Sequence, residues 1–81
     1  MSLRYPRVVR YAYYDREADI AWFPTGQSDA VISERVRGGL RDYDQASHTL
    51  VAVEVWAAST RLPATLLDAL PAPLRAHGAA V

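Results

Sequence analysis

The sequence predicts the α+β class: a small antiparallel β-meander of four to five strands with one short C-terminal helix. Three observations predict it. Aromatic and β-branched residues flank an acidic turn near residue 16, valines alternate along residues 49–57, and leucines recur every fourth residue from 62 to 70. A period of two is typical of strands, and a spacing of four places side chains on one helix face. None of these patterns reveals a chemistry.

The first predicted hairpin joins strands at residues 7–14 and 19–23. With a loop at residues 15–18, three cross-strand pairs follow: Tyr14 with Asp19, Tyr13 with Ile20, and Tyr11 with Trp22. Cross-strand aromatic pairs contribute about 0.2–1 kcal/mol each beyond alanine pairs. The apolar side chains then share one face, which fixes the register.

The middle of the chain predicts three further extended segments. Residues 24–29 form a turn, because proline cannot continue a ladder, and a third strand is expected at Val31–Val36. Gly38-Gly39 interrupts it with a bulge or sharp bend, and the extended path resumes over residues 40–44. After a turn at residues 44–48, the longest strand is expected at Thr49–Ala57.

This last strand is apolar on both faces and is therefore expected to be covered on both sides. Valines at 51, 53 and 55 lie on one face, and the other carries Leu50, Ala52, Glu54 and Trp56. A short helix supplies one cover with its stripe of Leu62, Leu66 and Leu70, beginning near Pro63 and ending at Pro71. Residues 72–81 are expected to form a loose tail.

Length and composition restrict the class of protein. The 81 residues allow one domain over residues 1–81, with an ordered core at about residues 5–71. A core of this size supplies only about 3–5 kcal/mol without a staple or a partner. The absence of cysteine excludes disulfides and thiolate metal sites. With no apolar run long enough for a membrane span and no signal segment, we expect a cytoplasmic bacterial-type protein without a membrane partner.

Charge is balanced overall but uneven along the chain. Arg4, Arg7 and Arg10 give residues 1–14 a charge of +3, and four acids with one arginine give residues 15–29 a charge of −3. Tyr5 and Tyr11 interleave with these arginines, as in single-strand nucleic-acid binders, but the acidic segment that follows would repel phosphate. We expect no nucleic-acid partner, and expect the arginines to pair with the acidic turn or with a neighbouring subunit.

The acidic turn begins like a calcium loop with Asp15, Glu17 and Asp19. That loop requires glycine at its sixth position and glutamate at its twelfth, and this chain has Ile20 and Gly26 there. The motif fails, so we expect Asp15 to accept backbone N–H bonds in the turn and expect no metal or cofactor.

Histidine and serine do not form a predicted catalytic pair. Ser47 and His48 are adjacent in extended chain and point to opposite faces, and His77 lies in the expected tail. We therefore expect no catalytic residues and no enzyme.

Glu54 is the acid that most needs an explanation, because it stands between valines and requires a partner or water. The predicted ladder places Arg41 and Arg37 diagonal to it. A cross-strand ion pair that fixes register is the first interpretation, and an acid lining a pocket or a dimer contact is the second.

Three segments carry a resemblance: Tyr-Asp-x-Glu-Ala-Asp-Ile-Ala-Trp at 14–22, Gly-Leu-x-Asp-Tyr-Asp at 39–44, and Leu-Val-x-Val-Glu-Val at 50–55 followed by Ala58-Ser59. In order and spacing the chain resembles, over residues 11–62, a family of small bacterial proteins known as domain of unknown function 2283. Typical members have proline in place of Arg16 and often glycine in place of Ala52. The resemblance implies a compact β-meander with a short helix, without an established activity or catalytic residues.

Our leading hypothesis is a non-catalytic protein-interaction module that self-associates through apolar sheet surface as a homo-oligomer, a dimer first. The candidate interface or structural residues are Trp56, Glu54, Arg41, Tyr11, Trp22 and Asp15. Family members thought to be encoded beside toxin-like genes imply an alternative, an antitoxin-like partner of a small toxin. A metal-dependent enzyme using Asp15, Glu17, Asp19 or Glu54 is a third hypothesis.

Overall fold

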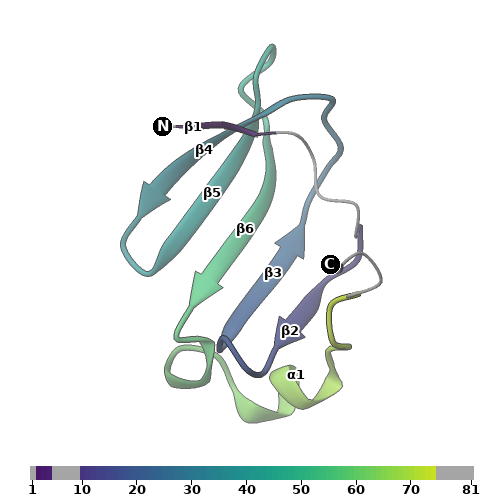
Figure 1. Ribbon diagram of the computed structural model, residues 1–81, viewed down its shortest axis with the longest axis vertical. Helices are drawn as coiled ribbons and strands as arrows, with labels where there is room; N and C mark the ends of the chain where they lie inside the picture. The colour runs from purple at the N-terminus through teal and green to yellow at the C-terminus, as the bar shows by residue number, and fades with distance from the viewer. Residues whose placement is uncertain (1, 5–9, 75–81) are drawn as a thin grey trace.

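The computed structural model describes residues 2–4 and 10–74. Within these residues one antiparallel sheet contains six strands: β1 Ser2–Arg4, β2 Tyr13–Asp15, β3 Ile20–Pro24, β4 Val31–Val36, β5 Gly39–Asp44 and β6 Leu50–Trp56. A 3-10 turn, η1 Ala58–Thr60, and a short helix, α1 Ala64–Ala69, follow (Figure 1). The predicted α+β class is confirmed, and β1 adds a short edge strand to the expected set.

The strand order is β1-β4-β5-β6-β3-β2. Strands β4, β5 and β6 are consecutive neighbours, as in a meander, but β3 pairs with β6 rather than with β4. The connection from β3 to β4 is hydrogen-bonded to the C-terminal end of β5 and to the N-terminal end of β6. The amides of Thr25 and Gly26 donate to the Val51 carbonyl, and the Ser28 hydroxyl donates to Asp44.

The register of the first hairpin differs from the predicted one by two residues. The observed pairs are Asp15 with Ile20, Tyr14 with Ala21, and Tyr13 with Trp22. Asp15 ends β2 because its carboxylate accepts the amides of Glu17 and Ala18, and Asp19 takes a left-handed conformation with φ 58°. The loop is therefore 16–19. A shift of two leaves each side chain on its predicted face.

Tyr11 is not in a strand, so its predicted pairing with Trp22 is wrong. Residues 10–12 are irregular, and residues 5–9 of the expected strand lie outside the described residues. The Tyr11 side chain is 37% exposed, and its hydroxyl donates to the Ala72 carbonyl at 3.4 Å. Tyr14 N–H donates to the Pro71 carbonyl at 2.9 Å, so the chain after α1 returns along β2. Residues 75–81 of the expected tail lie outside the described residues.

The predicted interruption at the two glycines is a tight hairpin turn formed by Arg37 and Gly38, the sharp bend of the two alternatives and not the bulge. Val36 pairs with Gly39, and Gly38 lies in the turn with φ +83°. Gly39 lies so close to β6 that a Cβ there would overlap the carbonyl oxygen of Glu54. The irregularity in the sheet instead falls between β5 and β6, at Asp42/Tyr43. The predicted segments at 31–36, 40–44 and 49–57 otherwise match β4, β5 and β6 closely.

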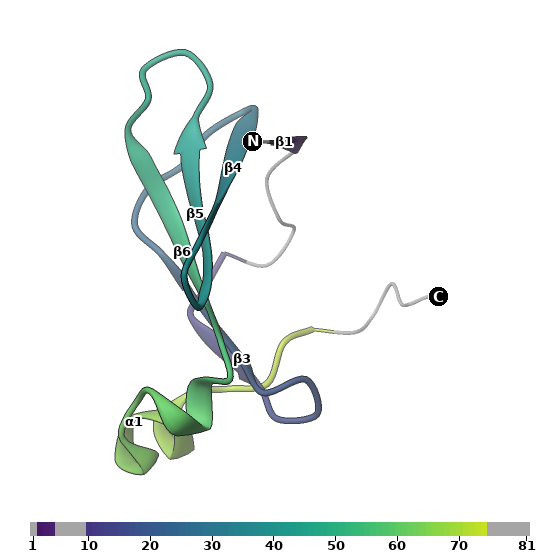
Figure 2. The same cartoon turned by 90° about the vertical axis from the view of Figure 1, so that its left-hand side faces the viewer.

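Different groups of residues pack on the two faces of the sheet. We call the side that carries Tyr14, Ala21, Val55 and Arg41 the helix face, and the side that carries Tyr13, Trp22, Glu54 and Leu40 the aromatic face. On the helix face, Ala21, Ala58 and Leu67 form a buried cluster, with five partly buried residues against it: Tyr14, Phe23, Val55, Leu62 and Leu70. Figure 2 shows α1 beside the lower end of the sheet.

Of the predicted leucine stripe, Leu62 and Leu70 pack against the sheet, but Leu67 takes the place expected for Leu66. Leu67 is 4% exposed and carries the contact with the sheet, whereas Leu66 is 38% exposed. The helix begins only after Pro63, so Leu62 precedes it and does not set its phase. Arg16 in the first hairpin loop donates to the carbonyls of Leu67 and Leu70, both at 3.1 Å, which ties the loop to the C-terminus of α1. Within the described residues, no helix has the length and apolar character needed to cross a bilayer.

Candidate functional site

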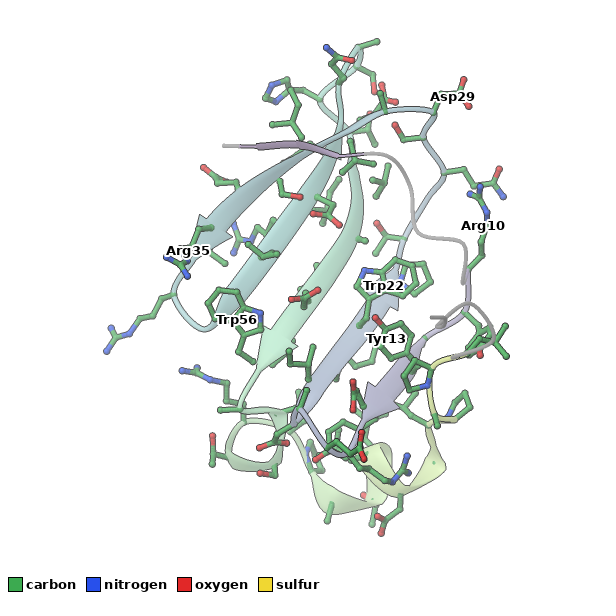
Figure 3. All side chains as sticks on the ribbon, in the orientation of Figure 1. Arg10, Tyr13, Trp22, Asp29, Arg35 and Trp56 are labelled. Carbon is green, nitrogen blue, oxygen red and sulfur yellow. The ribbon has the colours of Figure 1, made fainter. Side chains whose placement is uncertain are left out.

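One row of side chains crosses the aromatic face over five strands. Successive strand pairs place its members directly opposite one another, in the order Tyr13, Trp22, Glu54, Leu40 and Arg35. Directly opposite residues in an antiparallel ladder have Cβ atoms about 4.5–5.5 Å apart. The row therefore runs from two aromatic rings through one carboxylate and a leucine to a guanidinium. Figure 3 shows Tyr13, Trp22, Trp56 and Arg35 along this face.

Trp56 links the charged members of this row. Its Nε1–H donates to Glu54 Oε2 at 2.7 Å, and the Arg35 guanidinium carbon lies 5.2 Å from the Trp56 ring centroid. A hydrogen bond to an ionised group is stronger than a neutral one, and an exposed cation–π contact adds about 0.5–1 kcal/mol. The half-buried indole is thus held by two charges of its own chain, which gives Trp56 a role inside the molecule.

The predicted contact between Glu54 and Arg41 is wrong. Glu54 lies opposite Leu40 in the β5–β6 ladder, and Arg41 lies opposite Val53, so the two side chains leave opposite faces of the sheet. The prediction failed because the register was continued from the turn at residues 44–48, whereas the irregularity at Asp42/Tyr43 shifts the pairing of β5 with β6 by one residue and so moves Arg41 to the other face. The turn at Arg37-Gly38 instead pairs Arg41 with Glu34.

Trp22 is a core residue of the aromatic face. Its ring stacks on Tyr13 with centroids 5.6 Å apart and an interplanar angle of 28°. Tyr13, Trp22 and Ala52 form a buried cluster, with exposures of 7%, 5% and 3%. Such an aromatic pair contributes about 0.5–1.5 kcal/mol beyond its buried area. Trp22 is therefore a structural residue, as predicted, but its aromatic partner is Tyr13 and not Tyr11.

A buried polar pair on the same face was not found from the sequence. The Ser33 hydroxyl donates to Asp42 Oδ1 at 2.6 Å, and the two residues are 5% and 4% exposed. They lie directly opposite each other in the β4–β5 hairpin. The Arg37-Gly38 turn is the signal that could have revealed the pair, because a two-residue turn fixes which residues face each other.

Much of the helix face is not covered by α1. We call this part the open patch: Ile32, Glu34, Val36, Arg41, Tyr43 and Val53. Five of these side chains are half-buried and Arg41 is exposed. In Figure 2 α1 lies away from β4 and β5, the strands that carry most of the patch. At one end of the patch the Tyr43 ring stacks on His48, with centroids 5.8 Å apart.

Opposite charges lie side by side in the centre of the open patch. Glu34 on β4 is directly opposite Arg41 on β5, and the same register pairs Ile32 with Tyr43 and Val36 with Gly39. A surface of aliphatic and aromatic side chains with one acid and one base at its centre can bind a protein surface of matching charge.

The two carboxylates of the first hairpin loop serve the loop itself. Asp15 accepts amides as predicted. Asp19 accepts the Tyr14 hydroxyl at 2.6 Å, and the amide and hydroxyl of Ser59 at 2.9 and 2.7 Å. These bonds, the Tyr14 hydroxyl first, lower the pKa of Asp19, and the bond to Asp19 raises the pKa of Tyr14.

Asp44 organises the turn between β5 and β6. Its Oδ1 accepts the Ser28 hydroxyl at 2.5 Å, and its Oδ2 accepts both the amide and the hydroxyl of Ser47, at 2.7 and 2.9 Å. The Ser28 hydroxyl contributes most to holding the pKa of Asp44 at about 2, and the Ser47 amide and hydroxyl follow. The carboxylate remains ionised at neutral pH and fixes the turn.

The polar groups with catalytic potential have separate structural partners. The Ser47 hydroxyl bonds to Asp44 while the adjacent His48 ring lies against Tyr43. His77 lies outside the described residues. Among residues 2–4 and 10–74, no group of three or more His, Asp or Glu side chains is placed to hold a metal ion.

Comparisons with known proteins add no relative: no family model matches the chain, and no curated protein and no solved structure shows a significant match. The resemblance to domain of unknown function 2283 therefore stays a prediction.

Proposed function

We propose that this protein is a non-catalytic interaction module that self-associates through the open patch. The observation that carries the proposal is the partial cover of the helix face. α1 packs over Ala21 and Val55, whereas β4 and β5 carry half-buried aliphatic and aromatic side chains on the same face beyond it. A second copy would remove this apolar surface from water, which stabilises by about 25 cal/mol per Å².

The small core supports the same proposal. Among the described residues no large side chain is less than 2% exposed, and most of the buried hydrophobic residues are divided between two separate clusters on opposite faces of the sheet. A domain of this size gains little net stability from its own core. Burial of the open patch against another subunit would add to it.

The aromatic face is the less suitable surface for the contact. Trp56 on this face already contacts both Glu54 and Arg35, and Tyr13 stacks on Trp22. A partner on this face would have to displace these contacts before gaining its own. The sequence-based choice of Trp56 as an interface residue is thus replaced by the patch on the opposite face.

Sedimentation equilibrium over about 1–200 μM protein, a range that spans the affinities of typical weak dimers, tests the proposal. We expect reversible self-association of the unaltered chain. Ile32→Lys or Val36→Lys should weaken it at least about tenfold, because a lysine would be desolvated in the contact. Two variants are used because either one could perturb the fold, which circular dichroism would report.

Two matched controls locate the contact. Leu66→Lys adds the same charge at an exposed position of α1 and should leave association unchanged. Trp56→Asp changes the aromatic face and should also leave it unchanged. A folded monomer at every concentration would overturn the proposal, and loss of association in Trp56→Asp alone would move the contact to the aromatic face.

A further inference from the structure

We propose that two copies stack on their open patches about a two-fold axis parallel to the strands, between β4 and β5. Glu34 of each copy then lies against Arg41 of the other. This inference rests on the proposed self-association and specifies its geometry. Its basis is the charge pattern at the centre of the patch, where Glu34 and Arg41 are direct neighbours on adjacent strands.

A symmetric contact must be complementary to itself. In a two-fold interface, if residue i of one copy touches residue j of the other, then j also touches i. A patch that holds one acid and one base side by side meets this condition only when the axis passes between them. Each copy then contributes one carboxylate and one guanidinium, and both intermolecular contacts join opposite charges.

Other axes in the plane of the sheet bring like charges together. An axis that runs along β5 places Arg41 on Arg41 of the partner subunit. An axis across the strands, at the level of this pair, places β4 on β4 and thus Glu34 on its own symmetry mate. Juxtaposed like charges in an interface cost several kcal/mol, so the charge pattern selects the axis parallel to the strands and between them.

The side chains around the charges fit the same axis. It places Val36 over Gly39 of the partner subunit, where no side chain competes for the space, and Ile32 over the partner's Tyr43. Sheets that pack face to face keep their strands within about 30° of parallel, which this axis allows.

The position of α1 is also compatible with this arrangement. α1 packs over the residues Ala21, Phe23 and Val55 of β3 and β6. In the strand order these strands lie on the far side of β5 from β4. A partner centred between β4 and β5 therefore meets the part of the face that α1 leaves uncovered.

Charge reversal tests the inference because it separates contacts within a chain from contacts between chains. Glu34→Arg alone and Arg41→Glu alone should each weaken self-association at least about tenfold, a factor that corresponds to 1.4 kcal/mol. An equimolar mixture of the two variants should restore association to within about threefold of the unaltered chain, as a heterodimer. In the mixture both intermolecular contacts join opposite charges, while within each variant the pair on β4 and β5 still carries like charges.

A control and a second variant complete the experiment. Arg10→Glu, at an exposed site outside the patch, makes the same change in net charge as Arg41→Glu but should self-associate like the unaltered chain, which excludes an effect of net charge. The doubly exchanged chain, Glu34→Arg with Arg41→Glu, should self-associate like the unaltered chain. If the unaltered chain associates but the mixture stays as weak as the single variants, the axis is wrong and the proposed function stands. A monomeric unaltered chain removes both.

Discussion

Gly39 shows how one residue sets the spacing of two strands. It pairs with Val55, and its α-carbon approaches the main chain of β6 so closely that a methyl group would overlap the Glu54 carbonyl. Main-chain atoms in a ladder cannot move aside as the end of a flexible side chain can. The residue lies at the start of β5, so any displacement there would propagate along the β5–β6 pairs.

We therefore expect Gly39→Ala to lower the free energy of unfolding by about 3 kcal/mol, at the upper end of the range for overpacking. Urea unfolding followed by tryptophan fluorescence would measure it. Gly26→Ala is the matched control, because a methyl group there would meet Val51 Cγ1 at 3.4 Å, an ordinary contact. It should change stability by less than about 0.5 kcal/mol. Equal effects of the two substitutions would contradict the close approach of β5 to β6.

Asp44 should make stability depend on pH in the acid range. Its pKa is about 2 in the folded protein against an ordinary value of 3.8, so the folded chain binds this proton less readily than the unfolded chain. The stabilisation is then fully present above pH 4 and is lost as the pH falls from 4 toward 2. Asp44→Asn should flatten the dependence of the melting temperature on pH in that window, and Ser28→Ala should flatten it partly. An unchanged slope in Asp44→Asn would contradict the assignment.

The acids divide into those that sequence alone can place and those that need the fold. The Asp15 carboxylate accepts from amides two and three positions further along the chain, so its role followed from local turn chemistry. Asp19 bonds to Ser59, and Asp42 bonds to Ser33. Ser59 is far from Asp19 in sequence, so no local pattern indicates that bond, whereas the Ser33–Asp42 pair follows once the turn at Arg37-Gly38 fixes the register of β4 and β5.

At the scale of elements, α1 is attached to the sheet mainly through Leu67. This side chain is 4% exposed within the cluster of Ala21 and Ala58, whereas the adjacent Leu66 is 38% exposed. A six-residue helix is too short to be stable alone, so its contacts with the sheet and the carbonyl bonds from Arg16 hold it.

Replacement of these two leucines should have unequal effects. Leu67→Ala should cost about 2–4 kcal/mol, because it leaves a cavity under the helix. Leu66→Ala, the same change one position earlier, should cost less than about 1 kcal/mol. Thermal unfolding followed by circular dichroism would compare them. A larger loss of stability in Leu66→Ala than in Leu67→Ala would instead support the buried face that the leucine spacing predicts.

Strand positions followed from the sequence more reliably than helix phase did. Strands β4, β5 and β6 are bounded by turn residues and show clear alternation, and their predicted limits agree with the structure closely. The helix carries more leucines than its buried face requires, and the start at Ala64 decides which of them turn inward. That start depends on η1, whose Ala57 takes a left-handed conformation with φ 51° that the sequence does not indicate.

At the scale of the whole molecule, the strand order could not be predicted from local patterns. Strands adjacent in sequence are the default neighbours, so the predicted meander implies β3 beside β4. What places β3 beside β6 is the packing of Ala58 and Leu67, which follow β6, onto Ala21 of β3. The row across the aromatic face and the charge pair of the open patch both depend on pairings between strands, so they became visible only in three dimensions.

The pairing of β3 with β6 also limits how early the protein can fold during translation. The N-terminal hairpin leaves the exit tunnel first, but residues 20–24 dock on residues 52–56, which are translated much later. Until β6 has been synthesised, the rings of Trp22 and Phe23 lack their native packing on the sheet and stay exposed on the nascent chain. β6 and Leu67, which packs against Ala21 of β3, both lie after residue 49. A polypeptide truncated before residue 50 would therefore leave the aromatic hairpin available to chaperones or to other unfinished chains.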